Sequence, residues 1–161
     1  MTHYSTGQKP EKLNAQAEKM ATKIVAHFKG KAIPVLSYQG LSGITAATAV
    51  MLAIHRQDPM FPFVMCYVRK EGEESHGHAA EWEKCGLHAL PLPWVGCFID
   101  DFICSGSTYE RVKAGTDLMI RDFSGCDTNA PETVTWEKNS VIVQVALSEF
   151  SVRDAARRGM F

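Results

Sequence analysis

Apolar residues along the chain form short unbroken runs that alternate with longer amphipathic segments. Three such runs, 32–36, 61–68 and 94–99, predict buried strands, because a strand covered on both faces carries apolar side chains on both. Residues 9–29 instead carry apolar side chains at helical spacing, with lysines on the opposite face, which predicts an amphipathic helix. Gly30 is expected to end this helix, because glycine readily adopts the left-handed conformation found after many helices.

The rest of the pattern predicts an α/β fold with a mainly parallel sheet. Residues 44–56 and 109–122 predict two more helices, and residues 140–147 predict a fourth strand. A polar, charged stretch without apolar periodicity, 69–84, predicts a mobile flap between the second and third strands. Strands that alternate with helices in this way form parallel sheets flanked by helices. A short terminal helix is expected over 148–158.

The third predicted helix and the segment after it set the expected C-terminal packing. Val112, Leu118 and Met119 are expected to face the core from this helix. Residues 123–139, where Gly, Asn and Pro cluster, are expected to form a loop.

Composition narrows the class of protein. A chain of 161 residues, 45% of them hydrophobic, suits one domain spanning residues 1–161. The formal net charge of −1 gives no sign of nucleic-acid binding, and no apolar run approaches the roughly 18 residues of a membrane span. The polar N-terminus lacks the apolar core of a signal peptide. Five cysteines without a CxxC pair are expected to be buried thiols, which predicts a cytoplasmic location.

Residues 97–108 (CFIDDFICSGST) carry the most specific chemistry in the chain. Asp100 and Asp101 interrupt the third strand, and the Ser-Gly-Ser-Thr of residues 105–108 precedes a helix. Such a helix start binds anions, because its backbone N–H groups lack partners and its dipole favours negative charge. Two carboxylates beside a phosphate cradle predict a ligand with phosphates and hydroxyls, together with a divalent cation. The alternative is an ordinary strand-turn-helix with a solvated acidic turn.

A second candidate anion site lies at residues 37–43, which are expected to form a glycine-containing loop between a strand and a helix. Alone, this pattern is typical of any tight turn. A dinucleotide-binding or response-regulator site is less favoured, because GxGxxG is absent and the acids share one strand end with a hydroxyl cradle. His76 and His78 without further ligands are weak evidence for a metal site.

Together these stretches resemble the type I phosphoribosyltransferases, which bind phosphoribosyl diphosphate (PRPP). Residues 97–108 match the PRPP motif of two acids, two apolar residues, a variable position and Thr/Ser-Gly-x-Thr/Ser. Residues 38–40 and the Ala-rich helix after them are similar to the pyrophosphate loop of orotate phosphoribosyltransferases. Gln39, however, stands where that family has lysine. Residues 69–77 resemble the same enzymes' flap in Arg69, Lys70, Glu71, His76 and Gly77, but the lysine between these groups is replaced by Glu73, Glu74 and Ser75.

The resemblance implies transfer of ribose 5-phosphate from PRPP to a nucleobase with release of pyrophosphate, by a homodimeric enzyme that uses Mg²⁺. Asp100 and Asp101 would bind the ribose hydroxyls and hold the metal indirectly, and catalysis would rest on them with Arg69 and Lys70. The implied substrate contacts are Ser105, Gly106, Ser107 and Thr108 for the 5′-phosphate, Tyr38, Gln39 and Gly40 for the pyrophosphate, and His76. The alternative is a non-catalytic relative that binds PRPP or a nucleotide, which the two missing lysines favour.

Overall fold

A computed structural model describes residues 10–70, 80–85, 92–100, 107–124, 135–136 and 145–146 of the chain. The helices in these ranges are α1 (Pro10–Phe28), α2 (Gly40–Gln57) and α3 (Ser107–Ser124). The strands are β1 (Ile33–Tyr38), β2 (Phe63–Val68), β3 (Ala80–Cys85), β4 (Trp94–Asp100), β5 (Thr135–Trp136) and β6 (Val145–Ala146).

The strands form one sheet in the order β3-β2-β1-β4-β5, and β6 pairs with β4 as well. The pairs β1–β2, β1–β4, β4–β5 and β4–β6 are parallel, and β3 is antiparallel to β2 at the edge. The predicted α/β fold with a mainly parallel sheet is therefore confirmed.

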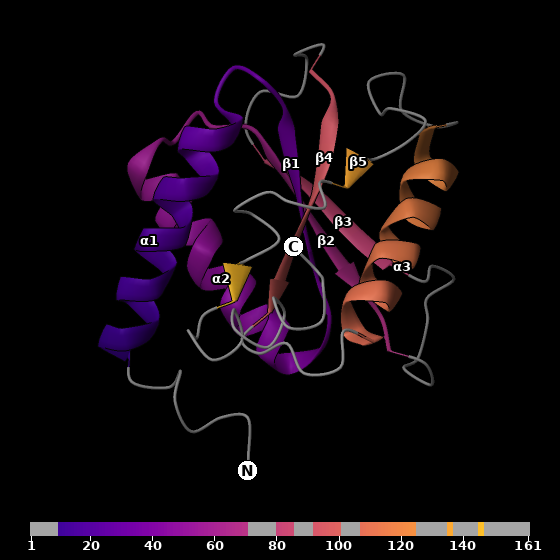
Figure 1. Ribbon diagram of the computed structural model, residues 1–161, viewed down its shortest axis with the longest axis horizontal. Coiled ribbons are helices and arrows are strands. Elements are labelled where there is room, and N and C mark those ends of the chain that lie inside the picture. Colours follow the sequence, from indigo (N-terminus) through magenta and orange to yellow (C-terminus); the bar gives the residue numbers. More distant parts are fainter. Residues whose placement is uncertain are drawn as a thin grey trace.

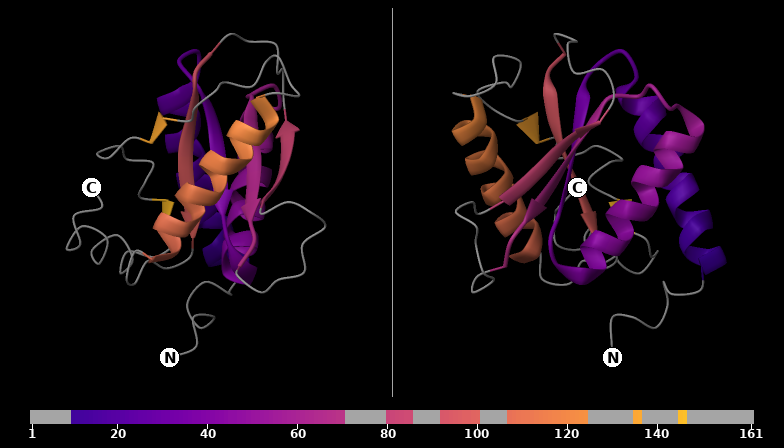
Figure 2. Two further views of the ribbon diagram at one scale, coloured as in Figure 1. Left: turned by 90° about the vertical axis from the view of Figure 1, so that its right-hand side faces the viewer. Right: turned by 180° about the vertical axis from the view of Figure 1, so that it is seen from behind.

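The sheet lies between two helical layers. Figure 1 shows α1 and α2 together on one face of the sheet and α3 alone on the other. Turned by 90°, α3 stands in front of the strands, with α1 and α2 behind them (Figure 2). Because β1, β2 and β4 are covered on both faces, they are apolar almost throughout, as the sequence indicates.

The layer of α1 and α2 contains the larger part of the core. The predicted stripe on α1 is buried at Ala17, Met20, Ile24 and Phe28, and small residues on α2 let the two helices approach closely. Alternate residues of the strands face this layer, including Leu36, and their neighbours face α3. Gly30 follows α1 with φ +72°, as predicted for its end.

Residues 80–85 correct one prediction. Residues 80–84 were expected to lie in the flap, but together with Cys85 they form β3, which pairs with β2 from Val68↔Ala80 to Phe63↔Cys85. The backbone of β2 offers a full ladder of hydrogen-bonding groups, so a polar segment can pair with it at an edge without an apolar pattern of its own. Residues 69 and 70 of the predicted flap follow β2, and residues 71–79 lie outside the described residues.

Further corrections concern the C-terminal part. Leu118 was expected in the core, but 49% of its surface is exposed, whereas Val112 is buried as predicted. Residues 135–136, within a predicted loop, form β5. Of the predicted strand 140–147 the structure describes only β6, and the predicted helix 148–158 lies outside the described residues.

The described cysteine side chains agree with the prediction of buried thiols. Cys66 and Cys97 are buried and not in disulfides. In the part of the chain that the structure describes, no helix is long and apolar enough to cross a membrane.

Candidate functional site

Three parallel strands end at one edge of the sheet, and the candidate site is built there. The register pairs Ser37 with Phe98, so Gln39 and Asp100 each lie two residues beyond this pair, and Gln39 directly follows Tyr38, which pairs with Tyr67. In Figure 1 the N-terminal ends of α2 and α3 reach this same edge. Ligands bind at the carboxyl ends of strands in open α/β sheets, which makes this edge the natural place for a ligand.

The junction between β1 and α2 is tighter than predicted. Residues 37–43 were expected to form a loop, but β1 continues through Tyr38 and α2 begins at Gly40, leaving only Gln39 between them. Gly40 has φ +71°, which favours glycine, and a Cβ on Gly43 would lie 3.3 Å from the Tyr38 Cβ. The glycines thus allow a sharp turn and a close approach of the helix to the strands.

The start of α2 has the properties of an anion site. Gln39 is the N-cap residue, but its side chain makes no capping hydrogen bond, and the first turn contains no acidic residue. The first backbone N–H groups of a helix have no partner within the helix, and the helix dipole adds positive potential. The start of α2 therefore presents donors suited to a phosphate group.

Residues from the end of β2 lie against this helix start. The Gln39 side chain is buried, and its Nε2 donates a 3.0 Å hydrogen bond to the carbonyl oxygen of Arg69. The Lys70 side chain lies over Gly40, since a Cβ built on Gly40 would be 2.9 Å from Lys70 Cε and 3.0 Å from Nζ. An ammonium group thus lies beside the donors of α2, which strengthens the case for an anion.

Asp100 places a carboxylate at the same edge. It is the last residue of β4, only 7% exposed, and its Oδ1 accepts a 3.4 Å hydrogen bond from Ser42 Oγ in the first turn of α2. A carboxylate at the mouth of such a site can accept hydrogen bonds from ligand hydroxyls. Sequence reasoning missed Ser42, and its only signal is its place in the first turn of a helix at a phosphate-type loop.

The start of α3 is the second predicted anion site. Ser107 and Thr108, expected just before the helix, lie in its first turn, and Thr108 Oγ1 accepts a 3.4 Å hydrogen bond from Arg111 Nη2. A hydroxyl and a guanidinium therefore meet at the N-terminal end of α3. Predicted site residues Asp101, Ser105, Gly106 and His76 lie outside the described residues.

A chain of buried hydrogen bonds holds α3 against the sheet. Thr116 Oγ1 donates to Ser37 Oγ at 3.0 Å and lies 3.6 Å from Cys66 Sγ, and the Ser37 hydroxyl reaches the Val35 carbonyl at 3.3 Å. Burial raises the pKa of the Cys66 thiol to about 11, so the thiol stays protonated and unreactive at neutral pH. These three side chains position α3; they are no candidates for catalysis.

We expect Thr116→Val to lower the free energy of unfolding by about 1–3 kcal/mol, because an isosteric side chain leaves the buried Ser37 and Cys66 groups without this partner. Urea unfolding of the wild type and the variant measures the loss. Thr116→Ser keeps the hydroxyl and serves as the control, with a smaller loss from the missing methyl group. A valine variant as stable as the wild type would contradict a stabilising role for the chain.

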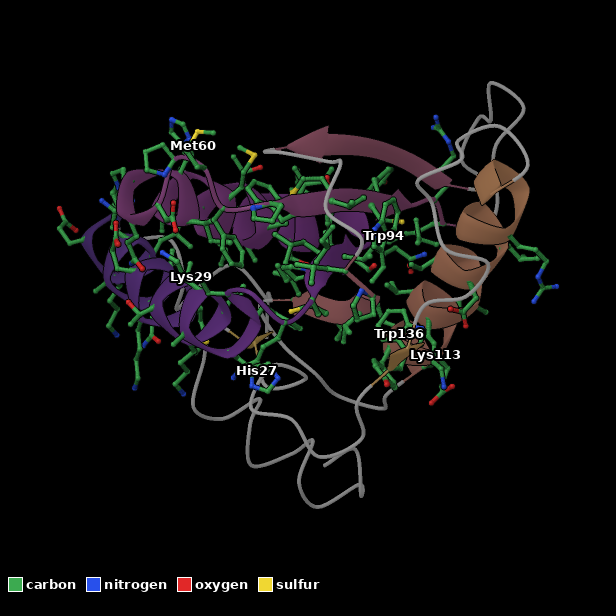
Figure 3. The ribbon with its side chains drawn as sticks, turned by 90° about the horizontal axis from the view of Figure 1, so that it is seen from above. His27, Lys29, Met60, Trp94, Lys113 and Trp136 are labelled. Atoms are coloured by element: carbon green, nitrogen blue, oxygen red, sulfur yellow. The ribbon has the colours of Figure 1, made fainter. Side chains whose placement is uncertain are left out.

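Aromatic side chains cover the other side of α3. The Trp136 indole lies directly on Gly96, donates a 2.8 Å hydrogen bond from Nε1 to Asp117 Oδ1, and meets the Tyr109 ring edge-on at 6.1 Å. Figure 3 shows Trp136 beside α3. Burial, with smaller contributions from Glu110 and Asp117, raises the pKa of Tyr109. The cluster joins α3 to β4 and β5.

The structure thus brings together six predicted site residues at one edge: Tyr38, Gln39, Gly40, Arg69, Lys70 and Asp100. Among the described residues, no group of three or more His, Cys, Asp or Glu side chains could hold a metal ion.

Comparison with solved structures shows a likeness of fold. The fold is similar to that of a hypoxanthine-guanine phosphoribosyltransferase from Bacillus anthracis, with a TM-score of 0.39 and 14% sequence identity. The alignment covers 78% of this chain and 63% of that enzyme, so the chain spans less than two thirds of its length. No protein-family model matches the sequence, and no curated protein matches it either. A likeness of this size carries no argument about function, which must come from the site itself.

Proposed function

We propose that the protein is a phosphoribosyltransferase that moves ribose 5-phosphate from PRPP to a nucleobase and releases pyrophosphate. The observation that carries the proposal is the meeting, at one sheet edge, of the Lys70 ammonium, the uncapped start of α2 and the Asp100 carboxylate. A ligand that satisfies all three has phosphate charge and hydroxyl donors close together.

The two helix starts suit the two ends of PRPP. The first turn of α2, with Lys70, would take the diphosphate, and the hydroxyls of Ser107 and Thr108 at the start of α3 would take the 5′-phosphate. Asp100 is the last residue of β4, which lies between α2 and α3 in the chain, and it would accept hydrogen bonds from the ribose hydroxyls. Further proposed contacts are Tyr38 and Arg69, together with four residues outside the described ranges: His76, Asp101, Ser105 and Gly106.

Transfer in such a site needs no covalent protein nucleophile. The base displaces the diphosphate at C1 of the ribose, and negative charge builds on the leaving group as the bond breaks. Lys70 and the N–H groups of α2 would stabilise that charge, and Asp100 would hold the sugar in place for attack. When bound, Mg²⁺ neutralises phosphate charge. Because Mg²⁺ needs few protein ligands when phosphates coordinate it, Asp100 would reach the ion through water or the ribose hydroxyls.

The test is PRPP binding by calorimetry with and without Mg²⁺, followed by pyrophosphate release across a panel of purine and pyrimidine bases. We expect binding that depends on the metal and release with at least one base. Metal-dependent binding without release would support the alternative, a non-catalytic PRPP-binding protein, and absent binding would refute both.

We expect Asp100→Asn to weaken PRPP binding roughly 10- to 100-fold, the effect of losing charged hydrogen bonds to the ribose. Binding of inorganic pyrophosphate, which has no ribose, should hardly change. Asp58→Asn is the matched control, because Asp58 caps the opposite end of α2 and pairs with Lys29 at 2.8 Å. Thermal unfolding confirms that each variant is folded. Equal losses for both ligands would show that Asp100 does not contact the sugar.

A further inference from the structure

Gln39 is buried in a way that calls for an explanation. Only 3% of its surface is exposed, and its Nε2 bonds to the Arg69 carbonyl oxygen, while its Oε1 has no hydrogen-bond partner among the described residues. Burying an amide is unfavourable unless its polar atoms are bonded. A side chain kept there despite this has a role in the placement of the groups around it.

The bonded carbonyl belongs to the peptide group that joins Arg69 to Lys70. β2 ends at Val68, so this peptide lies beyond the strand pairing of the described residues. The Gln39 hydrogen bond therefore extends the tie between β1 and β2 beyond the strand ends, to the point where the Lys70 side chain starts. From there Lys70 reaches back over Gly40, the residue that follows Gln39.

We infer that Gln39 is a positioning residue that holds Lys70 over the start of α2, and that Lys70 supplies the positive charge for a diphosphate group bound there. This inference rests on the proposed function, in which this helix start takes the diphosphate of PRPP. A neutral amide at position 39 brings no charge of its own, so the cation comes from the neighbouring strand. An uncharged residue in the loop is then compatible with a working leaving-group site.

The ligand chemistry follows from the charges. The first turn of α2 carries no acidic residue, and Lys70 Nζ lies 3.0 Å from where a Cβ on Gly40 would stand, so a group bound here meets helix donors and an ammonium at once. Such a combination favours a group with several negative charges, as in a diphosphate, over a neutral or singly charged one.

A double-mutant cycle with inorganic pyrophosphate as the probe tests the inference. Calorimetry in Mg²⁺ buffer compares the wild type with Gln39→Met, Lys70→Met and the double variant. We expect each single variant to lose about tenfold or more in affinity, and the double variant to lose no more than Lys70→Met, because Gln39 acts through Lys70. Gln57→Met, at the far end of α2 where Gln57 bonds to Glu18, is the control and should bind as the wild type does.

Additive losses in the cycle would overturn the inference, because Gln39 would then act independently of Lys70. Wild-type affinity in either single variant would overturn it too, as would a wild type that does not bind pyrophosphate. If the bond between Gln39 and Arg69 were merely structural, Gln39→Met would lower thermal stability but would show no coupling to Lys70→Met.

Amine footprinting gives a second readout without catalysis. Pyrophosphate should slow acetylation of Lys70 at least severalfold in the wild type and much less in Gln39→Met, with the exposed Lys12 as internal reference. No protection of Lys70 in a wild type that binds pyrophosphate would refute its placement.

The two proposals fail separately. Coupled pyrophosphate binding without turnover on PRPP and any base would leave the inference standing and refute the transferase. Turnover of PRPP that Lys70→Met leaves unchanged would refute the inference and leave the proposed transferase activity standing.

Discussion

Gly115→Ala is expected to destabilise the protein by up to about 2 kcal/mol, although alanine is the better helix former. A Cβ on Gly115 would lie 2.5 Å from Cγ1 of Val68 and 3.2 Å from its Cγ2, well inside van der Waals contact. Valine is branched at Cβ and stiff at χ1, so it cannot swing aside. Overpacking of this kind costs about 1–3 kcal/mol, more than the roughly 1 kcal/mol that alanine gains in a helix.

The same substitution should reverse its sign when Val68 is shortened. In a Val68→Ala background both clashing methyl groups are gone, and Gly115→Ala should then stabilise the protein by up to about 1 kcal/mol. Urea unfolding of the four proteins measures the coupling. Destabilisation by Gly115→Ala in both backgrounds would contradict the view that Gly115 is needed to make room for the Val68 side chain.

This contact links the packing of the fold to the site. Val68 is the last residue of β2 and immediately precedes Arg69 and Lys70, so the contact with Gly115 sets where the end of the strand lies. The buried bond from Thr116 to Ser37 holds the same part of α3 to β1. A helix packed at this depth therefore aligns the two strand ends that carry the proposed diphosphate site.

The elements predicted correctly are those whose own residues show the pattern of burial. The runs at β1, β2 and β4 are apolar because both faces of each strand are covered, and the stripe on α1 is apolar because one face is. Acids that close a buried strand, as at Asp100, mark its carboxyl end. These signals placed the sheet and the edge at which the candidate site lies.

What the sequence did not predict depends on partners distant in the chain. β3 is a strand because β2 offers it a backbone to pair with, and its own polar residues give no such sign. The hydrogen bonds from Gln39 to Arg69 and from Ser42 to Asp100 span 30 and 58 residues, so only the register of the strands creates them. Gly40 and Gly43 indicated a loop in the sequence. Their role in a helix start packed closely against Tyr38 and Lys70 becomes visible only in the folded structure.

Gly40→Ala is expected to weaken inorganic pyrophosphate and PRPP binding by roughly 10- to 100-fold, the effect of losing one charge-assisted contact. Gly40 has φ +71°, so alanine there carries backbone strain of about 1–2 kcal/mol. Its new Cβ would also lie 2.9 Å from Lys70 Cε, and since the lysine is long and flexible, the lysine moves. The ammonium then leaves the start of α2.

Gly30 separates the two effects, because it shares the backbone conformation but not the site. It has φ +72° and nothing within 4 Å of a built Cβ, so Gly30→Ala should cost the same strain with no displaced side chain. We expect both variants to lose about 1–2 kcal/mol in urea unfolding, and only Gly40→Ala to lose affinity for pyrophosphate. If Gly40→Ala bound pyrophosphate as tightly as Gly30→Ala does, the position of Lys70 over the helix start would have no part in holding the diphosphate.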